Sequence, residues 1–489
     1  MMTGSTDVTH PSSFRPALSR RAALLGCGAA ALLPWLPRAR ASPAEPRTIT
    51  LNAGPGQAAL LGDGSTRTAI WGYDGHVPGP EIRLRQGEPV RLVVENQLDQ
   101  DTTVHWHGVR VPNAMDGVPG LTQPPIRPGE RFTYAFTPPD AGTFWYHPHA
   151  NSLEQLGRGL AGVLIVEEPE PVAVDRDLVW MLADWRLSRD GRIAQGFGNG
   201  MEAAMAGRVG NWVTLNGTAP ADQPVQAGER IRLRLVNGAL ARMMALRFEG
   251  HRPVVVAVDG QPCDPHEPES GRLLLGPAMR LDVILDMQGD PGKRYRVVDD
   301  FYDGLAYTLT TLAYGERPPL RTQPPDASLR LPPNPLPEPD LATADRHELT
   351  LEGGMMGGGV MAGMGGMHGM ATPGMDGGAA WAINGMSMTG DGQAGMPPLF
   401  TLQRSRSCVL TIRNQTAWWH PMHVHGFSFR VLSRNGLPVP HRQWNDTVLF
   451  APKDTVECAF VADNPGDWML HCHVMDHQVA GLMTVFRVV

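Results

Sequence analysis

Short hydrophobic runs recur about every ten residues along most of the chain, and Gly, Pro, Asn and Asp separate them. Within a run such as 87–96, apolar residues alternate with polar ones, as Val90, Leu92 and Val94 do. Alternation with a period of two is typical of half-buried strands. The sequence has no long amphipathic helical pattern, so its histidines are expected to lie on strands and in the turns beside them. It therefore predicts antiparallel sandwiches or barrels rather than α/β units.

The same strand pattern occurs three times. The runs 87–96 and 228–237 each begin with Gly and end with Asn, and 407–414 repeats the alternation and the final Asn. A repeat of this kind predicts three copies of one sandwich domain. The predicted segments are a first domain at 45–168, a second at 169–318, a Pro-rich linker at 319–345 and a third domain at 346–489.

Residues 1–41 have the features of an export signal. Arg20 and Arg21 precede an apolar run at 22–33, and small residues around 39–41 offer a cleavage site. The run is too short to span a bilayer, and Cys27 within it is a candidate for lipid attachment. The paired arginines resemble a twin-arginine signal, which implies export of a folded protein by the twin-arginine machinery to the periplasm or the medium. An ordinary secretory signal that happens to contain Arg-Arg is the alternative.

Charge and cysteine content narrow the choice of partners. The formal net charge is −7, and loss of residues 1–41 with their five Arg and one Asp leaves −11. Because no dense Lys/Arg run occurs, nucleic acid is excluded as a partner, and small molecules or metal ions are favoured. Four cysteines remain, which are too few for a disulfide framework. Cys408 and Cys458 lie in strand-like runs and are candidates for one bridge.

Ten of the 17 histidines fall into four clusters. They are His105 and His107, His147 and His149, His420, His423 and His425, and His471, His473 and His477. On a strand, residues two apart share a face and lie about 6.6 Å apart along the chain. Each His-x-His pair can therefore direct two imidazoles at one metal cluster, and four such pairs supply eight nitrogen ligands.

Cys472 lies between two of these histidines. His471 and His473 face one way and Cys472 the other, so a copper bound by Cys472 is joined through peptide bonds to a cluster on the opposite face. A thiolate with two imidazoles is the ligand set of a blue copper site, and His420 and His477 are the histidines left to complete it. The zinc site of a hydrolase needs only three or four ligands, whereas eleven candidate ligands are present here, so zinc leaves most of them unexplained. Exposed strand histidines explain one pair but not four.

The four motifs resemble those of the multicopper oxidases, which include laccases, ascorbate oxidases, ceruloplasmin and bacterial cuprous oxidases. The resemblance covers nearly the whole mature chain and implies an all-β fold of three cupredoxin-like Greek-key β-sandwich or barrel domains. It implies four coppers per monomer: type 1 on His420, Cys472 and His477; type 2 on His105 and His423; and a type 3 pair on His107, His147 and His473, and on His149, His425 and His471. The trinuclear centre would lie between domains one and three, with domain two mainly a scaffold.

The resemblance also implies a proton supply for the reduction of dioxygen to water. In the family, an acidic residue shortly after the first motif serves this role, and Asp116 occupies that place. An Asp before Gly117 is equally typical of a turn. Bacterial members often have Glu directly after the second type 1 histidine, where this chain has Gln478. Proton delivery is therefore expected to depend more on Asp116.

The residues around the type 1 site bear on the substrate. The axial position five residues after His477 is Leu482, and Met483 should face the other way on a strand. A site without an axial thioether is expected to have a raised potential, which suits phenols and aromatic amines. Trp418 and Trp419 also favour organic reductants, or serve in packing. Cuprous oxidases are expected to have Asp and Met where this chain has Thr416 and Trp418.

An insert at 353–378 points instead to Cu(I). It contains twelve glycines, His368 and seven methionines, namely Met355, Met356, Met361, Met364, Met367, Met370 and Met375. Thioethers are soft ligands for Cu(I), whereas plain flexible linkers favour Gly and Ser. Bacterial cuprous oxidases resemble this chain in having Met-rich inserts in the same domain. We therefore expect a laccase-like oxidase that also oxidises Cu(I) and contributes to copper tolerance.

Three other functions fit parts of the pattern. A scaffold that has lost catalysis would lack ligands, and every ligand position is filled here. A non-catalytic periplasmic protein that sequesters copper is the main alternative, because the Met-rich insert alone would bind Cu(I). A copper nitrite reductase would share the sandwich domains and the blue site but would not need eight histidines for a trinuclear centre.

Overall fold

The computed structural model describes residues 46–62, 64–325, 329–355, 379–392 and 395–489. The predicted signal at 1–41 and all insert methionines except Met355 lie outside them. Strands dominate the described residues. The α-helices there are α1 (Ser152–Gly157), α2 (Gly200–Ala203) and α3 (Met475–Val479), with 3-10 turns η1 (Asn113–Met115) and η2 (Glu269–Gly271). None of these is long and apolar enough to cross a membrane. The predicted all-β class is confirmed.

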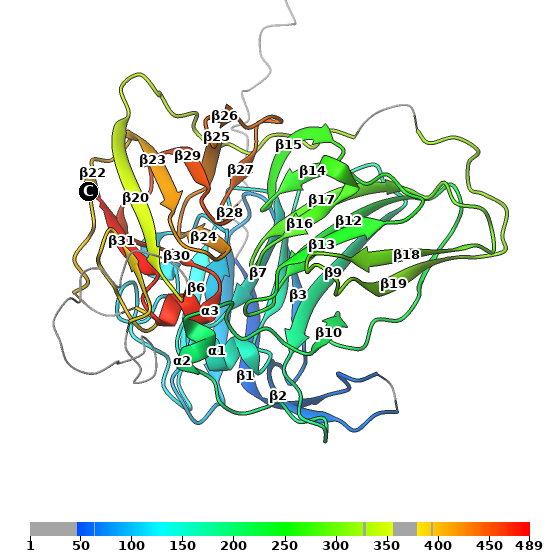
Figure 1. The fold of residues 1–489 in the computed structure, drawn as a ribbon, viewed down its shortest axis with the longest axis horizontal. Coiled ribbons are helices and arrows are strands. Elements are labelled where there is room, and N and C mark those ends of the chain that lie inside the picture. The colour runs from blue at the N-terminus through cyan, green and yellow to red at the C-terminus, as the bar shows by residue number, and fades with distance from the viewer. Residues whose placement is uncertain (1–45, 63, 326–328, 356–378, 393–394) are drawn as a thin grey trace, which may run out of the picture. The chain divides into compact units, whose positions relative to one another are not determined.

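The first segment forms two four-stranded sheets, drawn in blue and cyan in Figure 1. Their strand orders are β2-β1-β4-β6 and β3-β8-β7-β5. The strands are β1 (Arg47–Ala58), β2 (Thr68–Tyr73), β3 (Gly79–Arg85), β4 (Val90–Asn96), β5 (His105–His107), β6 (Arg131–Phe136), β7 (Gly142–His147) and β8 (Gly162–Glu167). Leu92 of one sheet and Leu164 of the other share a hydrophobic core, so the two sheets form a sandwich.

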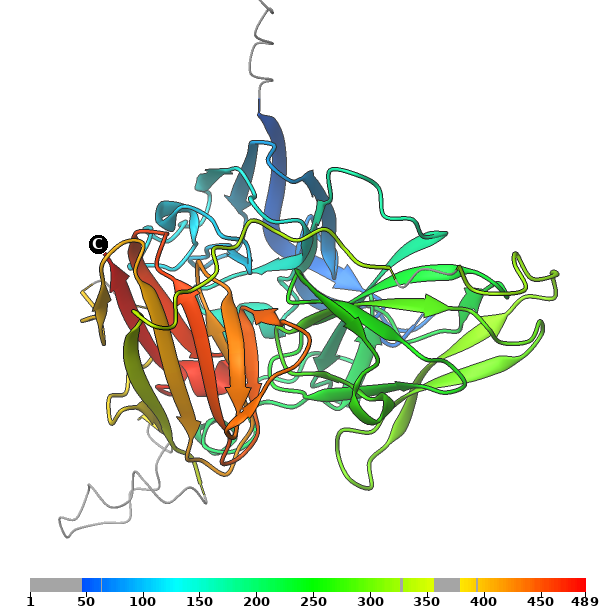
Figure 2. The ribbon, with the colours of Figure 1, turned by 90° about the horizontal axis from the view of Figure 1, so that it is seen from above.

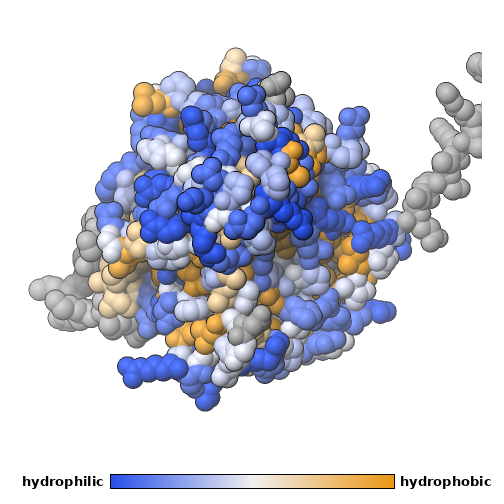
Figure 3. Space-filling view, turned by 90° about the vertical axis from the view of Figure 1, so that its right-hand side faces the viewer, coloured by the Kyte–Doolittle hydropathy of each residue, from blue (hydrophilic) through white to orange (hydrophobic). Residues whose placement is uncertain are grey.

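The middle segment has a six-stranded and a five-stranded sheet, drawn in green. Their orders are β10-β9-β12-β17-β14-β15 and β11-β19-β18-β13-β16. The strands are β9 (Arg176–Trp185), β10 (Trp212–Leu215), β11 (Gln223–Val225), β12 (Arg230–Asn237), β13 (Met244–Phe248), β14 (Val254–Val258), β15 (Gln261–His266), β16 (Leu273–Leu275), β17 (Arg280–Asp286), β18 (Arg294–Asp299) and β19 (Tyr307–Tyr314). Figure 3 shows that polar residues cover most of the side that faces right in Figure 1, with hydrophobic residues in small areas.

The third segment, drawn from yellow to red, has a seven-stranded and a five-stranded sheet. The first has the order β21-β20-β23-β29-β25-β26, with β27 paired to β25, and the second has the order β22-β31-β30-β24-β28. The strands are β20 (Asp345–Gly353), β21 (Trp381–Ile383), β22 (Thr401–Leu402), β23 (Ser407–Asn414), β24 (His420–Val424), β25 (Phe429–Arg434), β26 (Leu437–Pro438), β27 (Trp444–Asn445), β28 (Thr447–Phe450), β29 (Thr455–Val461), β30 (Gly466–Cys472) and β31 (Met483–Val488). Figure 2 shows β20, β23 and β29 side by side in this sheet.

The three runs predicted as repeats occupy equivalent strands. They are β4, β12 and β23, and each pairs in parallel with the first strand of its segment, β1, β9 or β20. On the other side each pairs antiparallel with a later strand, β6, β17 or β29. The same three-strand order therefore recurs in each segment, as expected for copies of one architecture.

The strands also explain the positions of the histidine motifs. β5 pairs antiparallel with β7, which sets His105 opposite His147. In the third segment β24 pairs antiparallel with β30, which sets His423 opposite His471. One predicted position differs. His477 lies on the short helix α3 rather than on a strand or a turn, because the chain winds once before β31 returns along β30.

Candidate metal centre

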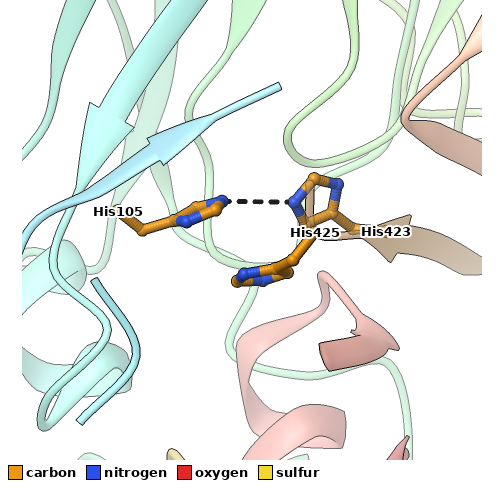
Figure 4. Close-up of side chains that lie close together, drawn as sticks. All are labelled: His105, His423 and His425. Atoms are coloured by element: carbon orange, nitrogen blue, oxygen red, sulfur yellow. Dashed lines mark hydrogen bonds between the residues drawn. The ribbon is translucent and has the colours of Figure 1, made fainter. Parts of the chain in front are cut away.

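Eight imidazoles from the two ends of the described chain meet in one buried group. His105 Nε2 lies 3.3 Å from His423 Nε2, as Figure 4 shows together with His425. A second contact between the first and third segments joins His147 Nε2 and His473 Nε2, also at 3.3 Å. The eight side chains are His105, His107, His147, His149, His423, His425, His471 and His473, and all are at most 2% exposed. All four His-x-His pairs predicted to converge are therefore brought together.

Hydrogen bonds hold the outward nitrogens of seven of these eight rings, whereas His473 Nδ1 has no partner among the described residues. Five imidazoles donate from Nδ1 to backbone carbonyls: His105 to Asp116, His147 to Pro148, His149 to Asp391, His423 to Asp446 and His471 to Cys472. A neutral imidazole has one N–H donor and one lone pair. The Nε2 lone pairs of these five rings are consequently free to bind a metal.

His107 has the opposite orientation. Its Nε2 lies 3.1 Å from both Asp446 Oδ1 and Thr447 Oγ1, and its Nδ1 lies 3.4 Å from His147 Nε2. His107 would therefore use Nδ1 as its ligand atom. His147 lies between His107 and His473, the other two ligands predicted for that copper. Outer partners that fix the tautomer and the ring orientation are typical of metal-ligating histidines.

The remaining ligand atoms form a compact group. His149, His425 and His471 have ligand atoms within 4.8 Å of one another, and His425 Nε2 lies 3.0 Å from His471 Nε2. His149 Nε2 is buried and has no hydrogen-bond partner among the described residues. Buried polar atoms without partners are rare in folded proteins. A bound metal ion would supply the missing partner of His149 Nε2, so the residues present fit copper.

Burial favours the neutral form of six of these imidazoles. It lowers the pKa of His107, His147, His425, His471 and His473 well below the usual value, and neighbouring imidazoles lower it further. For His149, burial lowers the pKa to about 3. Metal ligation requires the neutral form of imidazole. At neutral pH the group is therefore ready to bind metal without losing protons from these rings.

Cys472 lies on the other side of β30 with two further histidines. Its Sγ is 3.5 Å from His420 Nδ1 and 3.7 Å from His477 Nδ1, and the two Nδ1 atoms are 3.2 Å apart. The outward Nε2 of His420 bonds Thr416 Oγ1 at 2.8 Å, and that of His477 donates to Met205 O at 2.7 Å. Burial raises the pKa of the Cys472 thiol. Three ligand atoms of the blue-copper set thus converge on one point.

Leu482 and Met483, the neighbours of this site where the following strand β31 begins, face opposite ways, as expected from the sequence. Leu482 is fully buried in the same hydrophobic core as Cys472, and its carbonyl accepts a hydrogen bond from the Cys472 amide. Met483 packs in a separate cluster with Val118 and Met469. The thioether of Met483 therefore faces away from Cys472.

Asp116 lies at the buried end of η1, next to two of the histidines. Its Oδ2 accepts from His425 Nδ1 at 2.9 Å, and its carbonyl accepts from His105 Nδ1 at 2.7 Å. Gly117 follows with φ +89°, and a Cβ there would lie 2.0 Å from Val104 O. The turn therefore requires glycine, and it holds the carboxylate between the two rings. Asp116 can therefore both precede Gly117 in the turn and serve as the acidic residue beside the histidines.

Sequence reasoning missed a second carboxylate. Asp446 accepts from His107 Nε2 and from both terminal nitrogens of Arg280, and all three side chains are fully buried. Although burial opposes ionisation, Arg280 and His423 hold the pKa of Asp446 below its usual range. Burial and Asp446 together raise the pKa of Asp259, on the other side of Arg280. The middle segment, expected mainly as a scaffold, thus contributes Arg280 to the surroundings of the histidines. Asp446 lies in an ordinary strand-like run that carries no motif.

Asp391 is another residue without a sequence signal. Its carbonyl accepts from His149, and its carboxylate accepts from Ser152 N and from the Nε2 of Gln478 at 3.4 Å. Burial raises the pKa of Asp391 to about 6. A carboxyl group therefore lies beside Gln478, where bacterial relatives were expected to have Glu.

The candidate disulfide is not formed. Cys408 and Cys458 are both buried free thiols. On β23 and β29, Cys408 is opposite Phe460, whereas Cys458 is opposite Leu410. The two cysteines are therefore offset by two residues on neighbouring strands rather than directly paired.

Comparisons with known proteins agree with this geometry. Three family models described as multicopper oxidase match residues 56–171, 176–316 and 372–489. The multicopper oxidase MmcO of Mycobacterium tuberculosis is 30% identical over 94% of this chain and 90% of its own length. A multi-copper oxidase structure from Pseudomonas thermotolerans is 33% identical with a TM-score of 0.79, covering 91% of this chain and all of that one. A laccase-like multi-copper oxidase from Ochrobactrum sp., with activity towards lignin model compounds, is 27% identical with a TM-score of 0.75, covering 91% and 98%.

Proposed function

The chain belongs to the multicopper oxidase family, and we propose that its clustered histidines and Cys472 hold four copper ions per monomer. It is a copper-dependent oxidoreductase with three cupredoxin-like domains that uses dioxygen as acceptor. We assign type 1 copper to His420, Cys472 and His477, type 2 copper to His105 and His423, and the type 3 pair to His107, His147 and His473, and to His149, His425 and His471. The convergence of four motifs on two adjacent buried groups supports this assignment most strongly.

Bound copper supplies one-electron redox chemistry at the Cys472 site and four-electron reduction of dioxygen to water at the histidine group. The chain's own residues connect the two. Cys472 shares peptide bonds with His471 and His473, so the covalent route between the sites is short. Its Sγ also accepts from the amide of Val474 at 3.4 Å, which favours the thiolate that a metal requires.

We propose that Asp116 moves protons at its Oδ atoms. Oδ2 is bonded to His425 Nδ1, and Oδ1 lies 3.3 Å from His105 Nδ1, which already donates to the Asp116 carbonyl. Oδ1 therefore has no hydrogen-bond partner of its own among the described residues and is free to carry a proton. Dioxygen reduction consumes four protons, so a buried carboxyl group between His105 and His425 is well placed to deliver them.

The substrates we propose are phenols, aromatic amines and Cu(I). Leu482 supplies no thioether to the type 1 site, which favours a high potential and hard oxidations. The activity of the Ochrobactrum relative towards lignin model compounds supports the organic substrates. The methionines of the insert support Cu(I). At the start of the insert, the carbonyl of Met355 accepts from Nε1 of Trp418, which lies two residues before His420.

We further propose that the predicted domain boundaries and the export route hold. The sheets group by segment, and the described residues between β19 and β20 form neither strand nor helix, which supports a linker there. Export by the twin-arginine machinery would place the enzyme in the periplasm or the medium. Copper sequestration is the less favoured function, because a store needs no thiol joined directly to two ligands of a second site.

Copper content, visible absorption and oxygen uptake test the proposal together. The copper-loaded protein should hold about four coppers, absorb intensely in the red from the thiolate site, and consume dioxygen with Cu(I) or a phenol. Cys472→Ser should lose the blue absorption and one copper. Cys408→Ser, which alters a buried thiol outside the site, should keep the blue absorption and the full copper content. A protein that binds copper but consumes no dioxygen with either reductant would be a store and not an oxidase.

A further inference from the structure

One side of the type 1 site is covered by the middle segment. His477 is 1% exposed, and its outward nitrogen is used by Met205 O. The two preceding carbonyls bond the third segment as well: Ala203 O accepts from Trp381 Nε1 at 2.6 Å, and Ala204 O accepts from Met355 N at 2.7 Å. An organic molecule consequently cannot contact the His477 ring edge without moving the end of α2.

A cavity of about 730 Å³ opens elsewhere on the middle segment. It is lined by Trp212, Arg242, Tyr302, Leu305 and Tyr307, among others, and Leu305 at its rim is 72% exposed. Sites for small organic molecules commonly have volumes of about 300–1,000 Å³ and aromatic walls. The described lining contains no thioether, thiol, imidazole or carboxylate, so it has no ligand suited to Cu(I).

The polar groups of the cavity are already balanced in charge. Arg242 pairs with the buried Asp184 at 3.1 Å, and its guanidinium lies 5.6 Å from the centre of the Tyr302 ring. The Tyr302 hydroxyl accepts from Met243 N at 3.3 Å, which holds the ring in place. A neutral aromatic molecule therefore fits the cavity better than an ion does.

Aromatic side chains connect this cavity to the type 1 site. The Tyr302 ring is 4.9 Å from the Phe301 ring, and Phe301 packs edge-on against Trp419 at 5.4 Å. Trp419 is peptide-bonded to His420, whose Nδ1 faces Cys472 Sγ. The contacts form an unbroken path from the cavity wall to a predicted copper ligand.

We propose that this cavity binds one-ring phenols and that their electrons reach His420 through Phe301 and Trp419 rather than across His477. The inference rests on the proposed function and specifies its organic substrate site. Each phenol loses one electron and its hydroxyl proton, which passes to water at the cavity mouth, and leaves as a phenoxyl radical. Four such electrons, with four protons and one dioxygen, give two waters.

Filling the cavity tests the binding site. Ala219 lines the cavity, whereas Ala221 is exposed two residues further on, so Ala219→Trp and Ala221→Trp form a matched pair. Calorimetric titration of the copper-loaded protein with 4-nitrophenol, a phenol that resists oxidation, should give a Kd at least tenfold weaker in Ala219→Trp than in the parent. The KM for 2,6-dimethoxyphenol should rise similarly, and Ala221→Trp should match the parent. An unchanged Kd in Ala219→Trp overturns the site.

Interrupting the aromatic path tests the electron route. Phe301→Leu should lower kcat for 2,6-dimethoxyphenol at least tenfold, with KM within twofold, and leave the blue absorption and the rate with Cu(I) unchanged. Equal losses with both reductants, or none, overturn the route. The Cu(I) rate and the copper content of the parent report on the proposed function, and 4-nitrophenol binding reports on the cavity whether or not the parent turns over.

Discussion

Arg280→Met tests whether the buried ion pair between Arg280 of the middle segment and Asp446 of the third segment stabilises the fold. The guanidinium is fully buried and donates to Asp446 Oδ1 at 2.8 Å, to Asp446 Oδ2 at 2.5 Å, and to the carbonyls of Asp259, Ala278 and Thr143. Removing it leaves the Asp446 carboxylate buried without its cation. Breaking a buried ion pair on one side typically costs about 3–5 kcal/mol. At roughly 2–4 °C per kcal/mol for a domain of this size, we expect the melting temperature to fall by at least about 6 °C.

The assay is thermal unfolding of the metal-free protein, monitored by circular dichroism. Arg296→Met is the matched control, because Arg296 pairs with Glu249 at the surface, where such pairs contribute about 0–1 kcal/mol. The double variant Arg280→Met with Asp446→Asn should recover part of the loss, since no unpaired carboxylate then remains at position 446. If Arg280→Met melts within about 1 °C of Arg296→Met, the buried pair does not support the fold as argued.

Four further predictions follow from the geometry of the site. Asp116→Ala should keep the copper content but lose most oxygen consumption, and an unaltered rate would contradict proton delivery by this carboxyl group. Deletion of residues 354–377 should reduce Cu(I) oxidation more than phenol oxidation, and equal loss of both would argue against Cu(I) binding by the insert. Copper loading should release the thiol proton of Cys472, because burial raises its pKa, so pH-stat titration should record one proton fewer for Cys472→Ser than for the parent. Burial raises the folded-state pKa of Asp391 to about 6, above the unfolded value of about 3.9. Above pH 6 the ionised carboxylate therefore lowers the free energy of unfolding by up to about 3 kcal/mol, and this cost disappears as the pH falls to 4. Asp391→Asn should therefore raise the urea midpoint of the metal-free protein at pH 7 but not at pH 4, whereas a difference independent of pH would exclude Asp391 as its source.

The sequence is most informative where chemistry repeats at short spacing. His-x-His at strand spacing places both rings on one face, and four such pairs have few other uses than a metal cluster, so their convergence was predictable. The alternation in 87–96, 228–237 and 407–414 predicted equivalent strands for the same reason, since a period of two depends only on neighbouring residues.

Contacts between distant residues were not predictable in this way. Arg280 and Asp446 are 166 positions apart, and neither belongs to a motif, so only the packing of the middle segment against the third brings them together. The capping of His477 by Met205 O depends on where a four-residue helix ends, which no hydrophobic period specifies. The helical position of His477 was missed because α3 has too few residues to show a helical repeat.

The division of ligands between the two ends of the chain also bears on biosynthesis. During translation the first two histidine motifs emerge long before His471, Cys472, His473 and His477, and β31, which pairs with β30, emerges later still. A nascent polypeptide that lacks β30 therefore cannot assemble either of the proposed copper sites. Metal insertion into the proposed sites must therefore wait until both sets of ligands have been synthesised.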